Sequence, residues 1–121
     1  MIIAITGFKP KNLLKKFRFL SHAVPLFQLA QKSPGNIHTE RFTHQGYYHT
    51  ITAWESRDAM MGYVYSPAHQ KAIDLYDILG EGLTCHYESE EIPSSKDAIN
   101  YWRANGQCTQ SKIEDISDIN F

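Results

Sequence analysis

The predicted fold is decided by residues 47–79, which read YYHTITAWESRDAMMGYVYSPAHQKAIDLYDIL. Polar and apolar residues alternate as far as Trp54, and this alternation predicts a strand with one buried face. A serine then stands before each of two helical stretches, Arg57 to about Tyr65 and Pro67–Leu79. A serine hydroxyl at this place accepts a hydrogen bond from a first-turn N–H group, and proline is tolerated just inside a helix start. The segment therefore predicts a strand followed by two helices.

Further elements are predicted on both sides of this segment. They are a strand over Met1–Phe8, a helix over Lys11–Lys32, strands over Asn36–His44 and Tyr47–Trp54 joined by a tight Gln45-Gly46 turn, a strand over Leu83–Ile92, and a helix over Lys96–Ala104. Pro25 lacks an N–H group and clashes with the preceding turn, so the first helix either kinks there or is divided in two.

The predicted order is βαββαβ followed by a helix. This is the α+β, ferredoxin-like arrangement, in which one antiparallel sheet carries helices on one face. The strands are too apolar and aromatic to leave the other face in water, so we expect two chains to pair sheet against sheet as a homodimer. Residues 1–106 form the predicted domain, and residues 107–121 form a tail that either docks as a short helix or frays.

Composition narrows the class of protein. The chain has 121 residues, enough for one domain, and its aromatic content of 12% favours concave, aromatic-lined surfaces. The net charge of −1 gives no reason to expect nucleic-acid binding. Residues 1–60 hold eight Lys or Arg against three Asp or Glu, and residues 61–121 hold four against ten. We expect the two halves to lie together and neutralise each other, within one chain or across a dimer; a basic binding surface is the alternative.

Cysteine usage and hydropathy predict a cytoplasmic protein that does not bind a membrane. Cys85 and Cys108 are the two cysteines, and they lack the spacing of a disulfide framework or a thiol metal site. The apolar start of the chain is followed by lysines, which is the wrong order for a signal peptide, and no apolar run approaches membrane-spanning length. Metal binding by histidines is not expected either, because His38 and His44 share a strand face but stand about 20 Å apart.

The segment TITAWESRDAMMGYVYSPAHQKAI, residues 50–73, resembles the antibiotic-biosynthesis-monooxygenase-like proteins of the dimeric α+β barrel superfamily. It is most similar to an uncharacterised bacterial branch with a comparable Trp-acid turn, an Ala-Met helix start, and a small-residue–Ala–His–basic–Ala segment. The Ser33-Pro34-Gly35-Asn36 break and the ending from Ile92 to Trp102 are also similar. The resemblance implies the fold and the dimer. It does not select a reaction, because the superfamily includes cofactor-free monooxygenases, haem proteins and decarboxylases.

One face of the Tyr47–Trp54 strand is polar and aromatic, which suits the lining of a ligand cavity. The residues on this face are Tyr48, Thr50, Thr52 and Trp54. Trp54 could stack on a planar ligand and donate one hydrogen bond, or it could simply close the end of the sheet. Tyr63 is expected to shape the same cavity, or to belong to the core. Arg41 could anchor a carboxylate or form a salt bridge.

His69 is the candidate catalytic residue. Near neutral pH its imidazole could take a proton from a phenol or quinol, ligate a haem iron, or bond a neighbouring carbonyl. Haem-degrading relatives carry a catalytic tryptophan that would fall near Tyr63 and a ligating histidine ten residues later. Here His69 follows after only six, and the first strand lacks their asparagine, so haem is a minor alternative.

The sequence therefore supports two classes of function. One is a cofactor-independent monooxygenase acting on a phenolic, quinol or polyketide-like substrate, with His69 as base and no bound metal or flavin. The other is a non-catalytic, ligand-binding or stress-related dimer that uses the same cavity for a small apolar or aromatic ligand.

Overall fold

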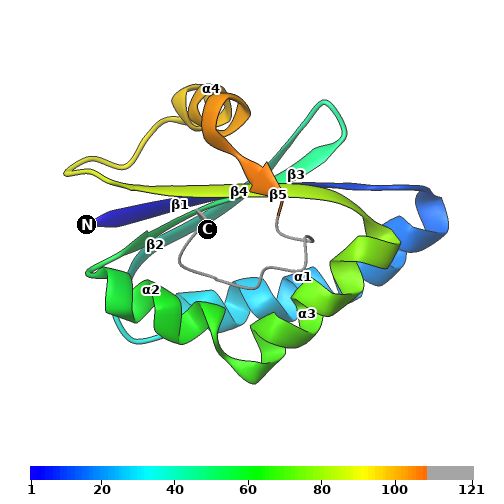
Figure 1. Cartoon of the computed structure of the whole chain (residues 1–121), viewed down its shortest axis with the longest axis horizontal. Helices are drawn as coiled ribbons and strands as arrows, with labels where there is room; N and C mark the ends of the chain where they lie inside the picture. The colour runs from blue at the N-terminus through cyan, green and yellow to red at the C-terminus, as the bar shows by residue number, and fades with distance from the viewer. Residues whose placement is uncertain (109–121) are drawn as a thin grey trace.

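The structure is a computed structural model that describes residues 1–108 (Figure 1). In chain order its elements are β1 (Ile2–Pro10), α1 (Leu13–Lys32), β2 (Asn36–His44), β3 (Tyr47–Trp54), α2 (Arg57–Val64), α3 (Pro67–Leu79), β4 (Gly80–Glu88), α4 (Ser95–Asn105) and β5 (Gln107–Cys108). The predicted ferredoxin-like order is confirmed. The predicted tail begins with β5, and the rest of it lies outside the described residues.

The sheet is antiparallel throughout its described pairs, with strand order β2-β3-β1-β4-β5. The first strand of the chain therefore lies in the middle, between β3 and β4. A two-residue turn joins β2 to β3, and both its residues have positive φ, 50° at Gln45 and 83° at Gly46. Positive φ at both positions is the pattern of the hairpin turn whose twist matches that of the strands.

The predicted serine caps are confirmed. The Ser56 hydroxyl accepts a hydrogen bond from the Ala59 N–H group at 3.1 Å, and the Ser66 hydroxyl accepts one from the N–H group of His69 at 3.4 Å. Each bond satisfies a backbone donor that the helix itself leaves without a partner. The second cap also fixes His69 in the first turn of α3.

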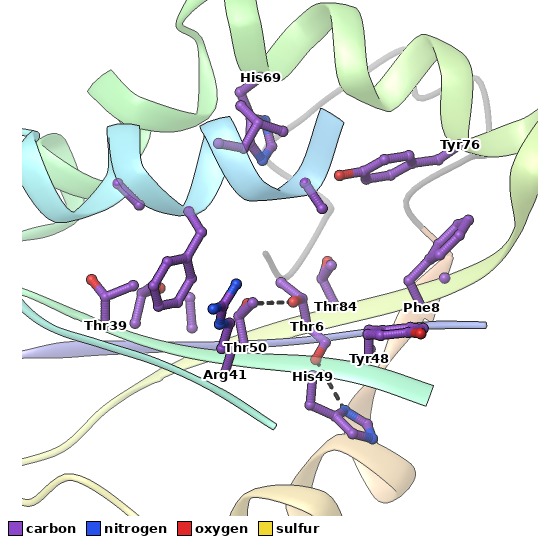
Figure 2. Close-up of a pocket in the computed structure, with 18 of the residues that line it drawn as sticks. Thr6, Phe8, Thr39, Arg41, Tyr48, His49, Thr50, His69, Tyr76 and Thr84 are labelled. Carbon is purple, nitrogen blue, oxygen red and sulfur yellow. Dashed lines mark hydrogen bonds between the residues drawn. The ribbon is translucent and has the colours of Figure 1, made fainter. Parts of the chain in front are cut away.

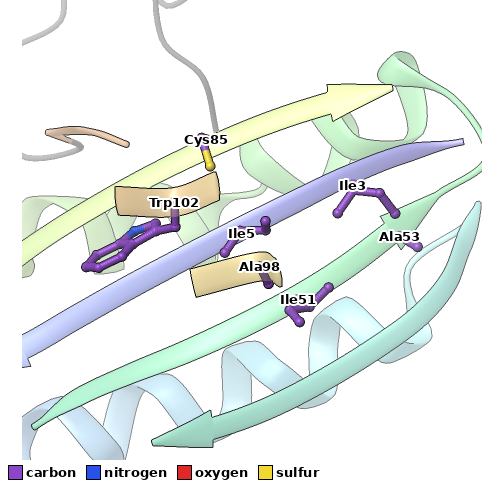
Figure 3. Close-up of a cluster of buried hydrophobic side chains, with 7 residues drawn as sticks. All are labelled: Ile3, Ile5, Ile51, Ala53, Cys85, Ala98 and Trp102. Carbon is purple, nitrogen blue, oxygen red and sulfur yellow. The ribbon is translucent and has the colours of Figure 1, made fainter. Parts of the chain in front are cut away.

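The helices form two layers, one on each face of the sheet. Figure 1 shows α1, α2 and α3 on one face and α4 alone on the opposite face. Ala98 and Trp102 of α4 pack against a buried cluster from the three central strands, drawn in Figure 3. The cluster residues from the strands are Ile3, Ile5, Ile51, Ala53 and Cys85. Thus α4 covers the centre of the face that the sequence argument assigned to a second chain.

The first helix, α1, runs through Pro25 as one helix rather than two. Its buried side chains are Phe19, Leu26 and Ala30. Three apolar residues near its start, Leu13, Leu14 and Phe17, are 62–80% exposed. The apolar spacing therefore predicted the helix correctly, but these three side chains do not face the core.

The fourth strand begins earlier than predicted. It starts at Gly80, directly after α3, because its first residues pair with the end of β1, where Gly80 lies opposite Pro10. A Cβ atom at Gly80 would lie 2.1 Å from the carbonyl oxygen of Lys9, so glycine is required at this close approach. The strand ends at Glu88, short of the predicted Ile92.

None of the helices within residues 1–108 combines the length and apolar composition needed to cross a bilayer.

Candidate functional site

A cavity of about 420 Å³ lies between the sheet and the layer formed by α1, α2 and α3 (Figure 2). This volume lies within the range of small-molecule sites. All six residues that the sequence nominated line the cavity: Tyr48, Thr50, Thr52, Trp54, Tyr63 and His69. The strand alternation therefore predicted the cavity face of β3 correctly. The functional roles of these side chains remain predictions.

The floor of the cavity is a polar row that crosses four strands. Strand register places Arg41 of β2 opposite Thr50 of β3, Thr50 opposite Thr6 of β1, and Thr6 opposite Thr84 of β4. All four residues line the cavity. The Thr6 and Thr50 hydroxyl groups share a hydrogen bond, drawn as a dashed line in Figure 2.

Aromatic side chains close one end of the cavity. The rings of Phe8 and Phe19 stack with their centroids 4.4 Å apart, and the Tyr76 ring lies 4.9 Å from that of Phe8. Burial raises the pKa of Tyr76 to about 12, so its hydroxyl stays protonated at neutral pH. In Figure 2 that hydroxyl points from α3 into the space above the sheet.

Trp54 and Tyr63 form a stacked pair in the opposite wall. Their ring centroids are 5.4 Å apart and their planes differ by 24°. The Trp54 ring is fully buried, and its indole N–H donates to the Thr52 hydroxyl at 2.9 Å. The Tyr63 hydroxyl donates to the carbonyl oxygen of Leu26 at 3.2 Å, which ties α2 to α1. The polar atoms of this pair are therefore engaged within the protein, and what the pair offers a ligand is shape.

His69 lies in the roof of the cavity, partly buried, with its ring edge-on to Tyr63 at 4.9 Å. Its Nδ1 atom is 3.1 Å from the carbonyl oxygen of Val64. A carbonyl can only accept, so Nδ1 carries the proton and the neutral ring keeps its lone pair on Nε2. Nε2 has no hydrogen-bond partner among the described residues.

Burial lowers the pKa of His69 to about 4, although the bond to Val64 acts in the opposite direction. The imidazole therefore titrates well below neutral pH, and its role as a base stays a prediction. At pH 7 the ring is neutral and Nε2 is available as a base, but as a weaker one than a solvent-exposed histidine.

The sequence did not predict that Arg41 lies in the wall of the cavity. Its guanidinium lies 5.1 Å from the ring centroid of Phe27 on α1. Among residues 1–108 the one salt-bridge contact brings His38 Nε2 within 3.0 Å of the Glu40 carboxyl group, so the salt bridge considered for Arg41 is not formed there. Thr6 and Thr84 were also missed. The sequence held one signal for Thr6, a single hydroxyl residue within the apolar first strand.

Residues 1–108 contain no group of three or more His, Cys, Asp or Glu side chains that could hold a metal ion. His49, on the same strand as Thr50, points to the other face of the sheet, where its Nδ1 atom lies 3.1 Å from the carbonyl oxygen of Thr6. His49 is among the residues that line the cavity, but its imidazole ring lies on the α4 side of the sheet, against Trp102.

No protein-family profile matches the chain, and no curated protein matches it in sequence. Solved structures do match it in fold. A candidate antibiotic biosynthesis monooxygenase from Deinococcus radiodurans is 16% identical, with a TM-score of 0.68 over 78% of this chain and 97% of that one. SnoaB, a cofactor-independent oxygenase from Streptomyces nogalater, is 13% identical, with a TM-score of 0.62 over 74% of this chain and 93% of that one.

A third solved structure, Rv0793 from Mycobacterium tuberculosis, is 12% identical, with a TM-score of 0.68 over 77% of this chain and 98% of that one. The chain therefore has the fold of the antibiotic-biosynthesis-monooxygenase-like proteins, as the resemblance implied. At these identities the likeness concerns the fold, and a shared fold does not carry a reaction with it.

Proposed function

We propose that this chain binds a flat phenolic, quinol or polyketide-like molecule in the cavity and oxidises it with O₂, without a bound metal, flavin or haem. The observation that carries the proposal is the composition of the cavity. Aromatic rings form its two ends, and a neutral histidine in the roof stands over a hydroxyl-lined floor. The likeness in fold to a cofactor-independent oxygenase supports the same reading.

The reaction requires little from the protein. The substrate has a CH₂ group activated by neighbouring phenolic rings, and the Nε2 atom of His69 takes one of its protons. The resulting carbanion reacts with O₂ to form a peroxide anion, which takes the proton back from Nε2. The hydroperoxide then loses water to leave a carbonyl group. One oxygen atom of O₂ ends in the product and the other in water. The aromatic walls hold the substrate and exclude bulk water.

The lowered pKa of His69 makes the proton transfer from the substrate to Nε2 unfavourable in free energy. Proton transfer from a carbon or phenol acid of pKa about 10 to an imidazole of pKa about 4 is uphill by roughly 8 kcal/mol. A turnover of about 10 s⁻¹ corresponds to a barrier of roughly 16 kcal/mol. The transfer therefore fits within such a barrier, and a cation near the substrate anion would lower its cost.

The test uses dithranol, a dihydroxyanthrone whose CH₂ group is oxidised to the anthraquinone carbonyl. We expect O₂ consumption above the blank without protein, and one ¹⁸O atom in the new carbonyl when the gas is ¹⁸O₂. His69→Gln should reduce the rate at least about tenfold, since general-base catalysis typically contributes 10²–10⁴-fold. His44→Gln, on the exposed end of β2, is the matched control and should keep the rate. Equal rates in both variants would exclude His69 as the base.

The second candidate function is non-catalytic binding of the same class of ligand. The observation in its favour is the burial that makes His69 a weak base. Dithranol or its anthraquinone would then bind at micromolar concentration, with no O₂ consumption above the blank. The binding and turnover measurements together separate the two functions.

Haem fits the cavity less well. A haem carries two propionate groups, whereas Arg41 is the only Lys or Arg among the described lining residues. His69 Nε2 could hold an iron atom, so the absorbance spectrum of the purified protein decides. A Soret band that is lost in His69→Ala would replace the proposal above with a haem protein.

The homodimer is part of the proposal. On the face covered by α4, half-buried aromatic side chains surround the buried cluster: Phe42, Tyr47, Tyr87 and Tyr101. A second copy packing over this rim would bury these rings and contribute hydrophobic free energy. Sedimentation equilibrium should give about twice the monomer mass of 13.9 kDa. A monomer at micromolar concentration would overturn this part.

A further inference from the structure

The cavity wall carries one full positive charge and no negative one. Among the described lining residues there is no Asp or Glu, and Arg41 is the only Lys or Arg. His69 is neutral at pH 7 because burial lowers its pKa to about 4. Such a wall is electrostatically complementary to an anion rather than to a neutral or cationic ligand.

The guanidinium of Arg41 lies where it can contact a ligand in the cavity. Its guanidinium lies over the Phe27 ring at 5.1 Å, so the side chain reaches from β2 in the floor toward α1 in the roof. The attraction between a cation and the face of an aromatic ring does not use the N–H donors of the guanidinium, which stay available to a carboxylate. Figure 2 shows the Arg41 side chain rising from the floor beside Thr50.

The floor continues from Arg41 with hydroxyl groups. Thr50 and Thr6 follow on the next two strands, joined by their hydrogen bond, and Thr84 follows on the fourth. Three steps between neighbouring strands, at about 4.8 Å each, give the row a length of roughly 14 Å. A ligand with an anionic group at one end and oxygen substituents along its edge would match this row.

We infer that the ligand is an aromatic carboxylate, whose carboxylate binds Arg41 and whose ring system extends over Thr50 and Thr6 toward the aromatic end at Phe8 and Tyr76. This inference rests on the proposed function and names the class of its substrate. The planar, two-pronged guanidinium matches a carboxylate in a way that a lysine would not. The negative charge of the ligand thereby supplies binding energy at a point away from the reacting CH₂ group.

The test compares two anthraquinones that differ in one substituent. Rhein carries a carboxylate where aloe-emodin carries a CH₂OH group. Binding of each to the full chain is measured by titration calorimetry at pH 7. We expect rhein to bind at least about tenfold more tightly, since a hydrogen-bonded charge contributes more than a neutral hydrogen bond. The advantage should shrink between 20 mM and 500 mM NaCl, because Arg41 is exposed enough to be screened.

The variants assign the effect to Arg41. Arg41→Gln should weaken rhein about tenfold or more and leave aloe-emodin within about twofold, which also shows that the cavity is intact. Arg41→Lys should retain only part of the preference for rhein, because an ammonium group cannot form the two parallel hydrogen bonds that a guanidinium forms with a carboxylate. Arg57→Gln removes the same charge from the exposed start of α2, outside the cavity lining, and should leave both affinities unchanged.

The outcomes separate this inference from the proposed function. If rhein and aloe-emodin bind equally well and Arg41→Gln changes neither, the carboxylate inference is wrong and the phenolic ligand stands. If neither compound binds, both are wrong. If Arg57→Gln weakens rhein as much as Arg41→Gln does, the preference reflects overall charge and the assignment to Arg41 fails.

Discussion

His69 and Val64 are joined by a hydrogen bond of 3.1 Å from the imidazole Nδ1 to the carbonyl oxygen at the end of α2. The bond crosses the break between α2 and α3 and holds the ring in one orientation. The Gln70 side chain donates to the same oxygen at 2.7 Å. Because Nδ1 is committed to this bond, any proton that the ring gains or loses in a reaction is carried by Nε2.

The activity should therefore depend on a group that titrates well below neutral pH. The kcat/KM for dithranol is expected to rise as the pH passes through about 4 and to be level between pH 5.5 and 7, because Nε2 acts as a base only when unprotonated. Stopped-flow measurements from pH 3.5 to 7 give the profile. A limb centred near 6.5, the ordinary histidine value, would contradict the buried environment described here.

The free energy of unfolding should also depend on pH through the titration of His69. The unfolded chain takes up a proton on His69 as the pH falls through 6.5, and the folded chain does so only near 4, so acid favours unfolding within this window. The full effect is roughly 3 kcal/mol, reached below about pH 4. Urea denaturation at pH 7 and pH 4.5 should show a larger loss for the wild type than for His69→Gln. Equal losses would mean that His69 has an ordinary pKa when folded.

The two tryptophans described on opposite faces of the sheet should report ligand binding differently. Trp54 lines the cavity, whereas Trp102 packs on the other face and donates from its indole to the carbonyl oxygen of Leu83 at 2.8 Å. Rhein is expected to quench the fluorescence of Trp102→Phe, which retains Trp54, far more than that of Trp54→Phe. Stronger quenching of Trp54→Phe would place the ligand on the α4 face.

The cavity illustrates which parts of a site a sequence reveals. Alternation along one strand was enough to place Thr50 and Trp54 on the same face, because side-chain direction depends only on local geometry. The neighbours of Thr50 depend on register with strands that are distant in sequence. Thr6 lies 44 residues away, and no local pattern states that it faces Thr50 rather than His49. The polar row therefore required the structure.

The Thr6–Thr50 hydrogen bond should be measurable by a double-mutant cycle. Thr6→Val or Thr50→Val alone leaves one hydroxyl without its partner and should cost about 1 kcal/mol, while replacing both should cost less than the two single changes together. Urea denaturation of the four proteins gives the coupling free energy. Strictly additive losses would indicate that the two hydroxyls bind water rather than each other.

The packing of α4 depends on the absence of a side chain at Gly7. A Cβ atom there would lie 2.5 Å from Trp102 Cζ2 and 2.7 Å from His49 Cε1. Gly7→Ala should therefore displace the indole and cost about 1–3 kcal/mol, with a red shift of tryptophan emission. Gly62→Ala is the control, since nothing lies within 4 Å of its Cβ position on α2. It should be neutral or stabilising by up to about 1 kcal/mol. A Gly7→Ala protein as stable as the wild type would show that α4 is not docked as described.

The side of the sheet on which α4 lies could not have been read from the sequence. The Ser94 cap and the apolar spacing specify a helix, and Ser94 does accept a hydrogen bond from the N–H group of Asp97. They do not specify which face the helix covers, because a cap and an apolar spacing are local features of the helix and do not depend on the sheet. The start of β4 was missed for a related reason. Glycine commonly marks the end of a helix, whereas Gly80 is also a strand residue that must pass close to the Lys9 backbone.

The absence of a loop between α3 and β4 also fixes one end of the helix that carries His69. The last residue of α3, Leu79, accepts a hydrogen bond from the N–H group of Lys11 at 2.9 Å, and Gly80 is already paired with Pro10. This end of the helix is therefore anchored in the sheet. At its other end the bonds of His69 and Gln70 to the Val64 carbonyl tie α3 to α2, so this wall of the cavity is secured at both ends.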